Sequence, residues 1–273
     1  MLDFLSKELL ARNIELFGTV PLDKCQITRP YKLTSFGNTD PSNLSAVIIA
    51  VPYYARVGAT NISRYAVPRD YHLFCDRLFG NLLPLLSQKF PQFKFCGFAD
   101  NSPINERDAA ALAGLGIIGD NYMLITEKYS SYVFLCEIIT DCPIKHPSTC
   151  EIRYCEHCGR CRSACPMNET GVCLSALTQK KGELDEIERA AILKHGCAWG
   201  CDICQDVCPH TKHAIESGSI YSPIEFFGEE LTPILSSKMI EDMSDEEFAH
   251  RAYSWRKKAT IRRNLEILES GTQ

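Results

Sequence analysis

Closely spaced cysteines dominate the stretch from Cys155 to Pro209. A first motif, C-x2-C-x2-C-x3-C-P, is formed by Cys155, Cys158, Cys161, Cys165 and Pro166. A second motif, C-x2-C-x3-C-P, is formed by Cys201, Cys204, Cys208 and Pro209. In bacterial two-cluster ferredoxins, three cysteines at this spacing bind one iron–sulfur cluster and the fourth binds the neighbouring cluster. The spacing therefore predicts two 4Fe–4S clusters, which transfer single electrons.

The ferredoxin rule also divides the cysteines between the two clusters. One cluster would be bound by Cys155, Cys158, Cys161 and Cys208. The other would be bound by Cys165, Cys201 and Cys204, and its fourth ligand would be Cys173 or Cys197. A zinc ribbon pairs two C-x2-C hooks and needs no third cysteine at the same spacing. A disulfide framework is disfavoured because the chain shows no secretion signal.

The composition describes a globular chain in a reducing compartment. The 273 residues are 45% hydrophobic and 23% charged, which is enough for one large domain or two smaller ones. The net charge of −5 argues against nucleic-acid binding over the whole surface, but not against a local basic patch. No apolar run is long enough to predict a membrane span. Labile clusters and fifteen cysteines favour a cytoplasmic location.

Residues 1–140 show the patterns of a mixed α/β domain, with loops of Pro, Thr, Asn and Ser between the elements. We expect a helix over 2–13, strands over 14–20, 45–54 and 93–100, a helix over 69–89, and two strands within 122–140. Pro84 should kink the second helix or end it early. Asn105 should cap a short helix that ends near Ala113. The strand over 93–100 brings Asp100 to its carboxyl end, and strand ends are where α/β domains place ligands.

Two further patterns, one of glycines and one of cations, can each be interpreted in two ways. Gly114, Gly116 and Gly119 spell G-x-G-x-x-G, but a helix precedes the motif and a strand follows it, which is the reverse of a dinucleotide fold. These glycines therefore indicate a backbone held close to a flat ligand or to a neighbouring strand.

The segment 243–268 begins with a capping box of Ser244 and Glu247. It also carries six cations beside Tyr253 and Trp255, namely Arg251, Arg256, Lys257, Lys258, Arg262 and Arg263. They form either a solvated helix face or a contact for an RNA backbone.

Several stretches together resemble the epoxyqueuosine reductases, cobalamin- and iron–sulfur-dependent enzymes of the last step of queuosine synthesis in tRNA. The matching stretches are RYAVPRDYH (64–72), ADNSPINER (99–107), AGLGIIGDN (113–121), SYVFLCEIIT (131–140) and GCDICQDVCP (200–209). The likeness covers roughly residues 45–265 in the family's order, and GCDICQDVCP is its most specific part.

The resemblance implies a fold and a division into domains. The expected fold is α/β (α+β), with a cobalamin-binding domain over 1–145, a double 4Fe–4S ferredoxin-like domain over 146–222 and a short helical region over 223–273. The activity implied is the reduction of epoxyqueuosine to queuosine in tRNA. The implied cofactors are two 4Fe–4S clusters and cobalamin, and the implied partners are tRNA and an external low-potential electron donor.

The resemblance also implies roles for individual residues. Asp100 matches the family's proton donor above the corrin, and such an acid suits a reaction that loses an epoxide oxygen as water. Cys173 matches the fourth ligand of the second cluster, which leaves Cys197 without a ligand role. Ser63, Leu124 and Leu135, together with Asp100, match cobalamin contacts. His72 is expected to be a packed or loop histidine.

Some positions depart from the family pattern. Ile117 and Asp120 stand where an aromatic and a basic residue are usual, Pro68 replaces a usual glycine, and the C-terminal helical repeat is expected to be short. Two other functions follow if these departures matter. The chain could reduce a small molecule instead of a tRNA, or it could be an electron carrier for a partner enzyme. The large domain before the cysteines argues against a bare carrier.

Overall fold

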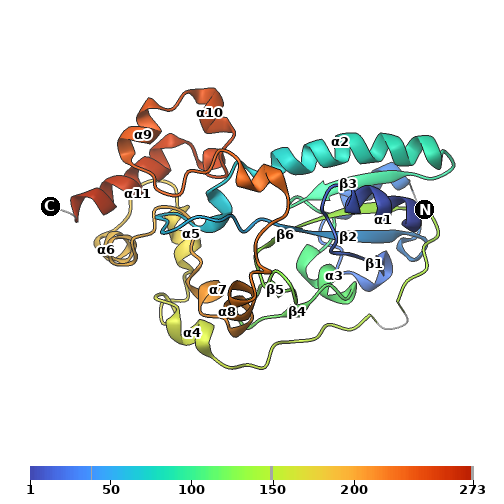
Figure 1. Cartoon of the computed structure of the whole chain (residues 1–273), viewed down its shortest axis with the longest axis horizontal. Coiled ribbons are helices and arrows are strands. Elements are labelled where there is room, and N and C mark those ends of the chain that lie inside the picture. The colour runs from blue at the N-terminus through green and yellow to red at the C-terminus, as the bar shows by residue number, and fades with distance from the viewer. Residues whose placement is uncertain (38, 148–149, 272–273) are drawn as a thin grey trace. The chain divides into compact units, whose positions relative to one another are not determined.

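The computed structural model describes residues 1–37, 39–147 and 150–271, and it divides into two compact units (Figure 1). The first, which we call the sheet unit, consists of Met1–Tyr53, His72–Cys158 and His213–Ile224. The second, the helical unit, consists of Tyr54–Tyr71, Gly159–Lys212 and Glu225–Gln273. Each unit is thus assembled from three separate segments of the chain, and the expected three-domain division stays a prediction.

A four-stranded antiparallel sheet forms the centre of the sheet unit, in the order β1-β2-β6-β3. Its strands are β1 (Phe17–Pro21), β2 (Ser45–Pro52), β3 (Phe95–Ala99) and β6 (Val133–Thr140). All eight residues of β2 are buried, which explains its continuous apolar sequence. Because β2 and β3 both run opposite to β6, their carboxyl ends lie at one edge of the sheet. Asp100 therefore follows a strand end as predicted, although the sheet is antiparallel throughout its described strands.

Helices cover both faces of this sheet. They are α1 (Leu2–Leu10), α2 (Tyr71–Lys89) and α3 (Glu106–Leu112), and Figure 1 shows α2 and α3 on opposite sides of the strands. The ring of Phe79 on α2 lies so close to Gly97 on β3 that a Cβ atom there would come within 2.6 Å of it. The alanines of α3 pack on the other face, in a core with Ile48 and Ile139. Asn105 caps α3 by accepting from the Asp108 N–H, which confirms the predicted cap.

Of the two alternatives predicted for Pro84, a kink or an early end of α2, the early end is wrong. The helix continues through Pro84 to Lys89 and does not end early. Proline removes one backbone hydrogen bond and crowds the preceding turn, but a helix anchored on both sides of it can persist. Here Leu82 and Leu86 are buried on either side of Pro84, so packing against the core holds the helix together.

The G-x-G-x-x-G stretch lies between α3 and a small two-stranded sheet of β4 (Ile117–Ile118) and β5 (Leu124–Ile125). This order confirms that the motif is not a dinucleotide-binding turn. A Cβ atom at Gly116 would collide with the backbone carbonyl of Ile125 on β5. Of the two alternatives, the neighbouring strand accounts for the glycine at this position.

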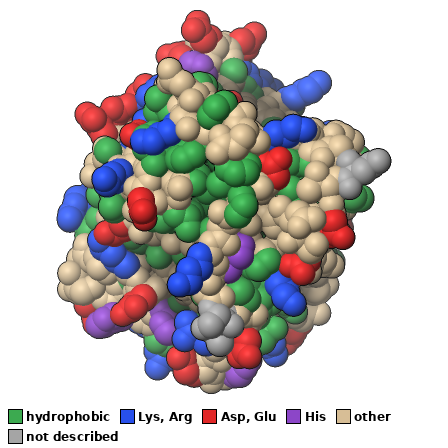
Figure 2. All heavy atoms as spheres, turned by 90° about the vertical axis from the view of Figure 1, so that its right-hand side faces the viewer, with side chains coloured by type: hydrophobic (Ala, Val, Ile, Leu, Met, Phe, Trp, Pro, Cys, Tyr) green, Lys and Arg blue, Asp and Glu red, His purple; other side chains and the backbone are tan. Residues whose placement is uncertain are grey.

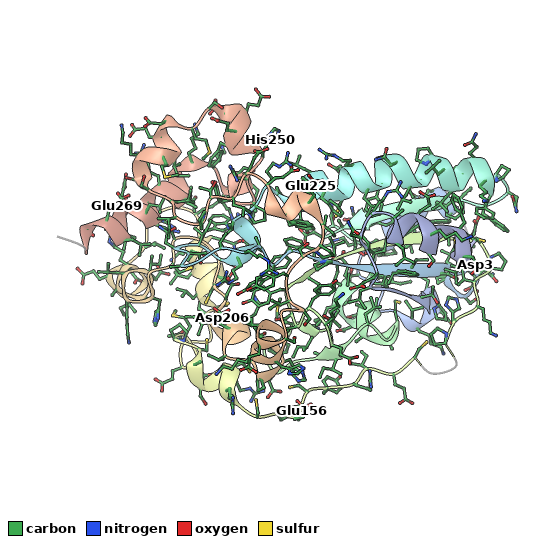
Figure 3. The ribbon with its side chains drawn as sticks, in the orientation of Figure 1. Asp3, Glu156, Asp206, Glu225, His250 and Glu269 are labelled. Carbon is green, nitrogen blue, oxygen red and sulfur yellow. The ribbon has the colours of Figure 1, made fainter. Side chains whose placement is uncertain are left out.

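The helical unit consists of short helices around a core that includes Trp199, Tyr253 and Ile261. The helices, with α8 crossing into the sheet unit, are α4 (Arg160–Ala164), α5 (Leu174–Thr178), α6 (Glu186–His195), α7 (Ile203–Asp206), α8 (Pro209–Glu216), α9 (Ser237–Asp242), α10 (Asp245–Ala249) and α11 (Lys258–Ser270). Near the end of α11, Glu269 accepts hydrogen bonds from the backbone N–H and the hydroxyl of Ser237, at 2.7 and 2.6 Å (Figure 3). These bonds tie α9 to α11.

The basic segment is not a single helix. Ser244 and Glu247 form the predicted capping box at the start of α10. The chain then leaves α10, forms a turn of 3-10 helix over Ser254–Arg256, and passes through Lys257 at φ +69° before α11 begins. The cations of this segment are therefore distributed over the 3-10 turn, α11 and the connecting residues Arg251 and Lys257.

The surface shows no strong separation of charge on the side seen in Figure 2, where acidic and basic side chains alternate around a group of apolar ones. Within the described residues, no helix combines the length and apolar character needed to cross a membrane.

Candidate functional site

Asp100 lies directly after β3 in an unusual backbone conformation. Its φ is +60°, a left-handed value that few residues other than glycine adopt but that aspartate tolerates. The side chain is 75% exposed, so its carboxyl group is accessible at the edge of the sheet. The backbone N–H of Asp100 donates a hydrogen bond to Oε1 of Glu106 at 3.1 Å. The acid predicted from the sequence thus lies in a loop whose backbone is held by a hydrogen bond to Glu106.

His72 faces this acid. It lies in the first turn of α2, and its Nε2 is 4.0 Å from Oδ2 of Asp100. Sequence reasoning treated His72 as a packed or loop histidine. The structure instead pairs it with Asp100, which gives the site a second group able to hold or release a proton.

Two glutamates that the sequence reasoning missed lie behind Asp100. Glu137, in the middle of β6, is fully buried, and Ser102 donates a hydrogen bond from its hydroxyl to Oε1 of Glu137. Burial raises the pKa of Glu106 to about 7. Burial, and then the neighbouring Glu106, raise the pKa of Glu137 well above its ordinary range. A signal was present in the sequence, because Glu137 is the one charged residue in the apolar stretch SYVFLCEIIT.

Three of the cysteines expected to bind the second cluster lie near one another in the helical unit. Cys201 and Cys165 pack against an apolar cluster that includes Leu174 and Leu177. Burial, with smaller contributions from Asp202 and from the nearby thiols of Cys173 and Cys165, raises the pKa of Cys201 to about 11. Cys173 is exposed at the start of α5, and Cys204 lies on α7.

Cys197 is in a different situation. Its Sγ donates hydrogen bonds to the carbonyl oxygens of Gly200, at 2.7 Å, and Trp199, at 3.6 Å. Burial raises its pKa to about 12. A thiol that donates to two backbone carbonyls is held in its protonated form, which favours Cys173 over Cys197 as the fourth ligand.

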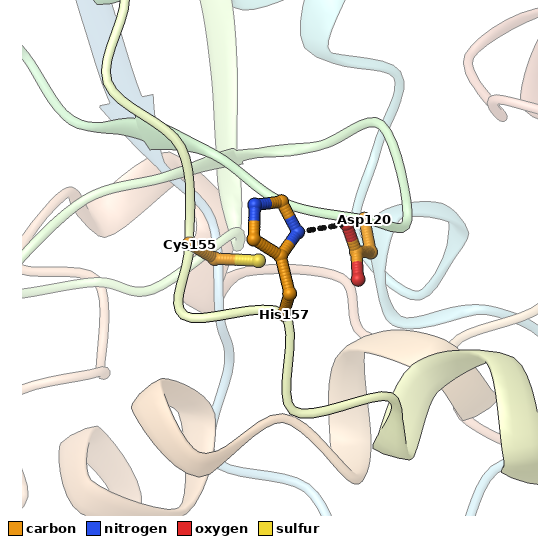
Figure 4. A group of neighbouring side chains, drawn as sticks. All are labelled: Asp120, Cys155 and His157. Atoms are coloured by element: carbon orange, nitrogen blue, oxygen red, sulfur yellow. Dashed lines mark hydrogen bonds and ion pairs between the residues drawn. The ribbon is translucent and has the colours of Figure 1, made fainter.

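The first cysteine motif is shared between the units. Cys155 and Cys158 belong to the sheet unit, whereas Cys161 and Cys208 belong to the helical unit, so their assignment to one cluster stays a prediction. Around Cys155, the ligand atoms of Asp120 and His157 lie within 4.8 Å of the thiol and of each other (Figure 4). Nδ1 of His157 is 2.7 Å from Oδ1 of Asp120. The acid that replaces a basic residue of the family pattern thus holds a histidine beside a predicted ligand.

The predicted cobalamin contacts lie in both units. Ser63, in the helical unit, is 3% exposed, and its backbone N–H donates to the carbonyl of Trp199 at 2.7 Å. Its hydroxyl donates to Asp202 at 2.6 Å. Leu124 and Leu135 are part of the core cluster of the sheet unit. Their role toward cobalamin stays a prediction.

The remaining cysteines outside the motifs are Cys25, Cys75, Cys96, Cys136, Cys142 and Cys150, and four of them are buried. Cys96 and Cys150 are partly buried and pack against the core of the sheet unit. All six have free thiols. Their packing is that of small apolar side chains.

Most cations of the basic segment are engaged within the helical unit. Arg251 donates to the carbonyl of Glu230, Lys258 to that of Met243 and Arg263 to that of Gly182. Arg262 pairs with Glu266 on α11. Tyr253 is fully buried, whereas Trp255 is 57% exposed and the Arg256 guanidinium lies 3.8 Å from its ring centroid. Most of the segment therefore serves the fold, whereas Trp255 and Lys257 are exposed and Arg256 is partly exposed.

Comparison with known proteins places these features in a family. No family model matches the chain. The epoxyqueuosine reductase of Gloeobacter violaceus is 32% identical over 240 residues, covering 82% of this chain and 72% of the relative. That of a Synechocystis species is 31% identical over 244 residues, covering 83% of both. That of Listeria monocytogenes is 32% identical over 247 residues, covering 82% of this chain and 63% of the relative.

Solved structures share the fold. The epoxyqueuosine reductase of Streptococcus thermophilus superimposes with a TM-score of 0.76 at 22% identity, over 100% of this chain and 81% of that one. A second epoxyqueuosine reductase, solved with a tRNA-Tyr stem loop modified with epoxyqueuosine, gives a TM-score of 0.74 at 24% identity, over 98% of this chain and 81% of that one. From the extent of the sequence likeness, the chain belongs to the epoxyqueuosine reductase family.

Proposed function

We propose that this chain is an oxidoreductase that converts epoxyqueuosine to queuosine in tRNA. The observation that carries the proposal is the likeness to a curated epoxyqueuosine reductase over 83% of both sequences. A solved structure of the same fold contains a stem loop of tRNA that carries epoxyqueuosine, which supports tRNA as the substrate. A reducing compartment such as the cytoplasm suits a chain with fifteen cysteines.

The thiols of the helical unit fit an iron–sulfur cluster. Burial and neighbouring thiols disfavour the ionised form of Cys201, so a group of such cysteines needs a positive partner to become thiolates. Iron supplies that charge, and the ligands would be Cys165, Cys173, Cys201 and Cys204. Those four cysteines would bind the second cluster, and Cys155, Cys158, Cys161 and Cys208 would bind the first cluster by the same spacing rule.

We assign cobalamin binding to Ser63, Asp100, Leu124 and Leu135. The fit rests on the edge of the sheet where β2 and β3 end, because this edge presents the exposed carboxyl of Asp100 next to His72. The hydroxyl of Ser63 is already bonded to Asp202 and its backbone N–H to Trp199, so its contact would be a packing contact. When bound, the clusters and the corrin cobalt would supply the two electrons of the reduction.

The chain's own residues would supply the proton. Opening an epoxide and losing its oxygen as water consumes two electrons and two protons. Asp100 would hold a proton at its carboxyl group and release it to the leaving oxygen. His72, 4.0 Å away, would orient that carboxyl group. The left-handed backbone of Asp100 and its anchor on Glu106 keep the acid at the edge of the sheet.

Trp255 and Arg256 are the proposed contact for the RNA. An exposed indole with a guanidinium on one face can stack on an unpaired base while the cation approaches a phosphate. Arg251, Lys258, Arg262 and Arg263 are bonded to carbonyl groups or carboxylates and are less available.

The experiment is an anaerobic assay on the full chain after reconstitution with iron, sulfide and cobalamin. With a chemical reductant and a tRNA that carries epoxyqueuosine, we expect queuosine among the nucleosides released by digestion, detected by mass spectrometry. The free epoxyqueuosine nucleoside serves as a second substrate. Turnover of the nucleoside but not of the tRNA would point to a small-molecule reductase, and turnover of neither by protein that has bound its cofactors would refute the proposal.

A further inference from the structure

The two glutamates behind Asp100 present a problem of hydrogen bonding. Glu137 pairs with Ile48 of β2 on one side and Phe98 of β3 on the other, so its side chain leaves the middle of the sheet. Oε1 accepts a hydrogen bond from Ser102, whose Oγ in turn accepts from the N–H of Ile104 at 3.1 Å. Oε2 is buried and finds no donor among the described residues. A buried carboxylate oxygen without a donor is costly.

The carboxyl group of Glu106 is the neighbour that can solve this problem. The two groups lie within interaction range, because each alters the pKa of the other. Two adjacent carboxylates repel when both are ionised, whereas one proton between them replaces the repulsion by a short, charge-assisted hydrogen bond. That proton would give Oε2 of Glu137 the bond that it lacks.

The other groups around the pair favour this assignment. The thiols of Cys75 and Cys136 come within electrostatic range of the pair, and neither thiol carries a positive charge. The positive group nearby is the guanidinium of Arg29, which acts on Glu106 and donates to the carbonyl of Ser102 at 2.9 Å. An ionised Asp100 would oppose this effect of Arg29, so the deeper burial of Glu137 decides which member is protonated. The ionised member is therefore Glu106, next to Arg29, and the protonated member is Glu137, in the fully buried position.

We propose that Glu106 and Glu137 share one proton and together position Asp100. Glu137 donates the proton to the Glu106 carboxylate, and that carboxylate accepts the backbone N–H of Asp100. The bond holds Asp100 at φ +60°, a conformation that costs about 1 kcal/mol or more when nothing supports it. The catalytic consequence rests on the proposed function of Asp100, whereas the shared proton itself does not.

The presence of the shared proton can be tested by a measurement that does not depend on enzyme activity. Infrared difference spectra of the reconstituted protein at neutral pH should show the C=O stretch of a buried protonated carboxylic acid. Glu137→Gln should remove this band, because the amide donates the same hydrogen bond without a titrating proton. Glu127→Gln, at an exposed glutamate of the same unit, should leave it in place. A wild-type spectrum without the band would overturn the proposal.

The positioning role is tested by hydrogen exchange of the Asp100 amide, followed by NMR. Glu137→Met removes the donor but keeps the length of the side chain, and we expect the amide of Asp100 to exchange about tenfold faster. Glu137→Gln should restore protection. If Glu137→Met does not fold, Ser102→Ala can be used instead, because it removes the hydrogen bond from Ser102 to Oε1 of Glu137. The amide of Asp100 should then also exchange faster, by a smaller factor. Unchanged exchange in a folded variant would show that the pair does not hold the loop.

Activity is measured last. Turnover should fall about tenfold in Glu137→Met and recover in Glu137→Gln, while the KM for tRNA stays unchanged. If the infrared band and the exchange behave as expected but no protein form reduces epoxyqueuosine, the proposed function fails and the carboxyl pair stands. If the wild type is active and Glu137→Met is equally active, the pair has no positioning role.

Discussion

The hydroxyl of Ser63 donates a hydrogen bond to one carboxylate oxygen of Asp202 at 2.6 Å, and the next residue, Arg64, donates its backbone N–H to the other oxygen at 2.6 Å. Asp202 lies between two predicted cluster ligands, Cys201 and Cys204. A single side chain thus fastens the segment before α2 to the cysteine motif within the helical unit.

We expect Asp202→Ala to destabilise the protein by about 3 kcal/mol, because it removes three bonds to a charged group, from Ser63, Arg64 and Gln205, and leaves a buried N–H without an acceptor. Ser63→Ala removes one donor only and should cost about 1 kcal/mol. Denaturant unfolding of the reconstituted protein under anaerobic conditions measures both values. Equal losses for the two variants would mean that Asp202 does not hold Arg64.

The second cluster depends on which cysteine completes it. We expect Cys173→Ser to lose about four of about eight iron atoms per chain, because one cluster would lack its fourth thiolate. Cys197→Ser should keep the full iron content, since its thiol is occupied with the carbonyls of Gly200 and Trp199. Iron and sulfide analysis with EPR of the reduced protein distinguishes the variants. The reverse pattern would exchange the roles of the two cysteines.

The acid role of Asp100 is tested by Asp100→Asn. Asparagine also tolerates the left-handed conformation, so the backbone should be retained while the proton is lost. We expect turnover to fall by roughly 100-fold or more, with unchanged binding of hydroxocobalamin followed by its absorption spectrum. Full turnover would exclude Asp100 as the proton donor, and loss of the corrin would show that Asp100 holds the cofactor instead.

The sequence predicted the elements whose signals are local. The continuous apolar run of β2, the spacing of leucines in α1 and the caps at Asn105 and Ser244 all depend on residues a few positions apart. The failures have tertiary causes. Leucines packed on both sides of Pro84 preserve α2, and the left-handed Lys257 breaks a segment whose composition reads as helical.

Some residues of the candidate site could likewise be predicted from local sequence signals, and others could not. Asp100 and the cysteines follow from motifs, and their types and spacing are visible in the sequence. The neighbours His72 and Glu137 come from α2 and β6, and sheet register, not sequence distance, brings them near Asp100 and Glu106. Only the isolated charge of Glu137 in an apolar strand signalled in advance that a buried acid needed a partner.

The glycines between α3 and β5 should respond differently to alanine. Gly116→Ala would place a methyl group against the carbonyl of Ile125, so we expect a loss of about 2–3 kcal/mol from overpacking. Gly114 has open space around it but a φ of +79°, so Gly114→Ala should cost about 1 kcal/mol. As a control, Gly80→Ala in α2 has open space and a helical backbone, and it should stabilise by about 0.5–1 kcal/mol. Thermal unfolding ranks the three variants, and a Gly116 variant as stable as the wild type would contradict the close approach to β5.

The raised pKa of Glu106 predicts how stability depends on pH. The pKa is about 7 in the folded protein and has its ordinary value of 4.5 in the unfolded chain, chiefly because burial disfavours the carboxylate. Between these values the folded state binds more protons than the unfolded state, so the stabilisation is complete below 4.5 and is lost as the pH rises through 7.

For Glu106 alone the loss is on the order of 3 kcal/mol, and Glu137 contributes in the same direction. Free energies of unfolding should be measured between about pH 5.5 and 8.5 for the wild type and for Glu106→Gln, which cannot titrate. As the pH falls, the free energy of unfolding of the wild type should rise relative to that of Glu106→Gln. Glu127→Gln should follow the wild-type curve, because that side chain is exposed. Parallel curves for the wild type and Glu106→Gln would show that the carboxyl group of Glu106 titrates as an ordinary glutamate.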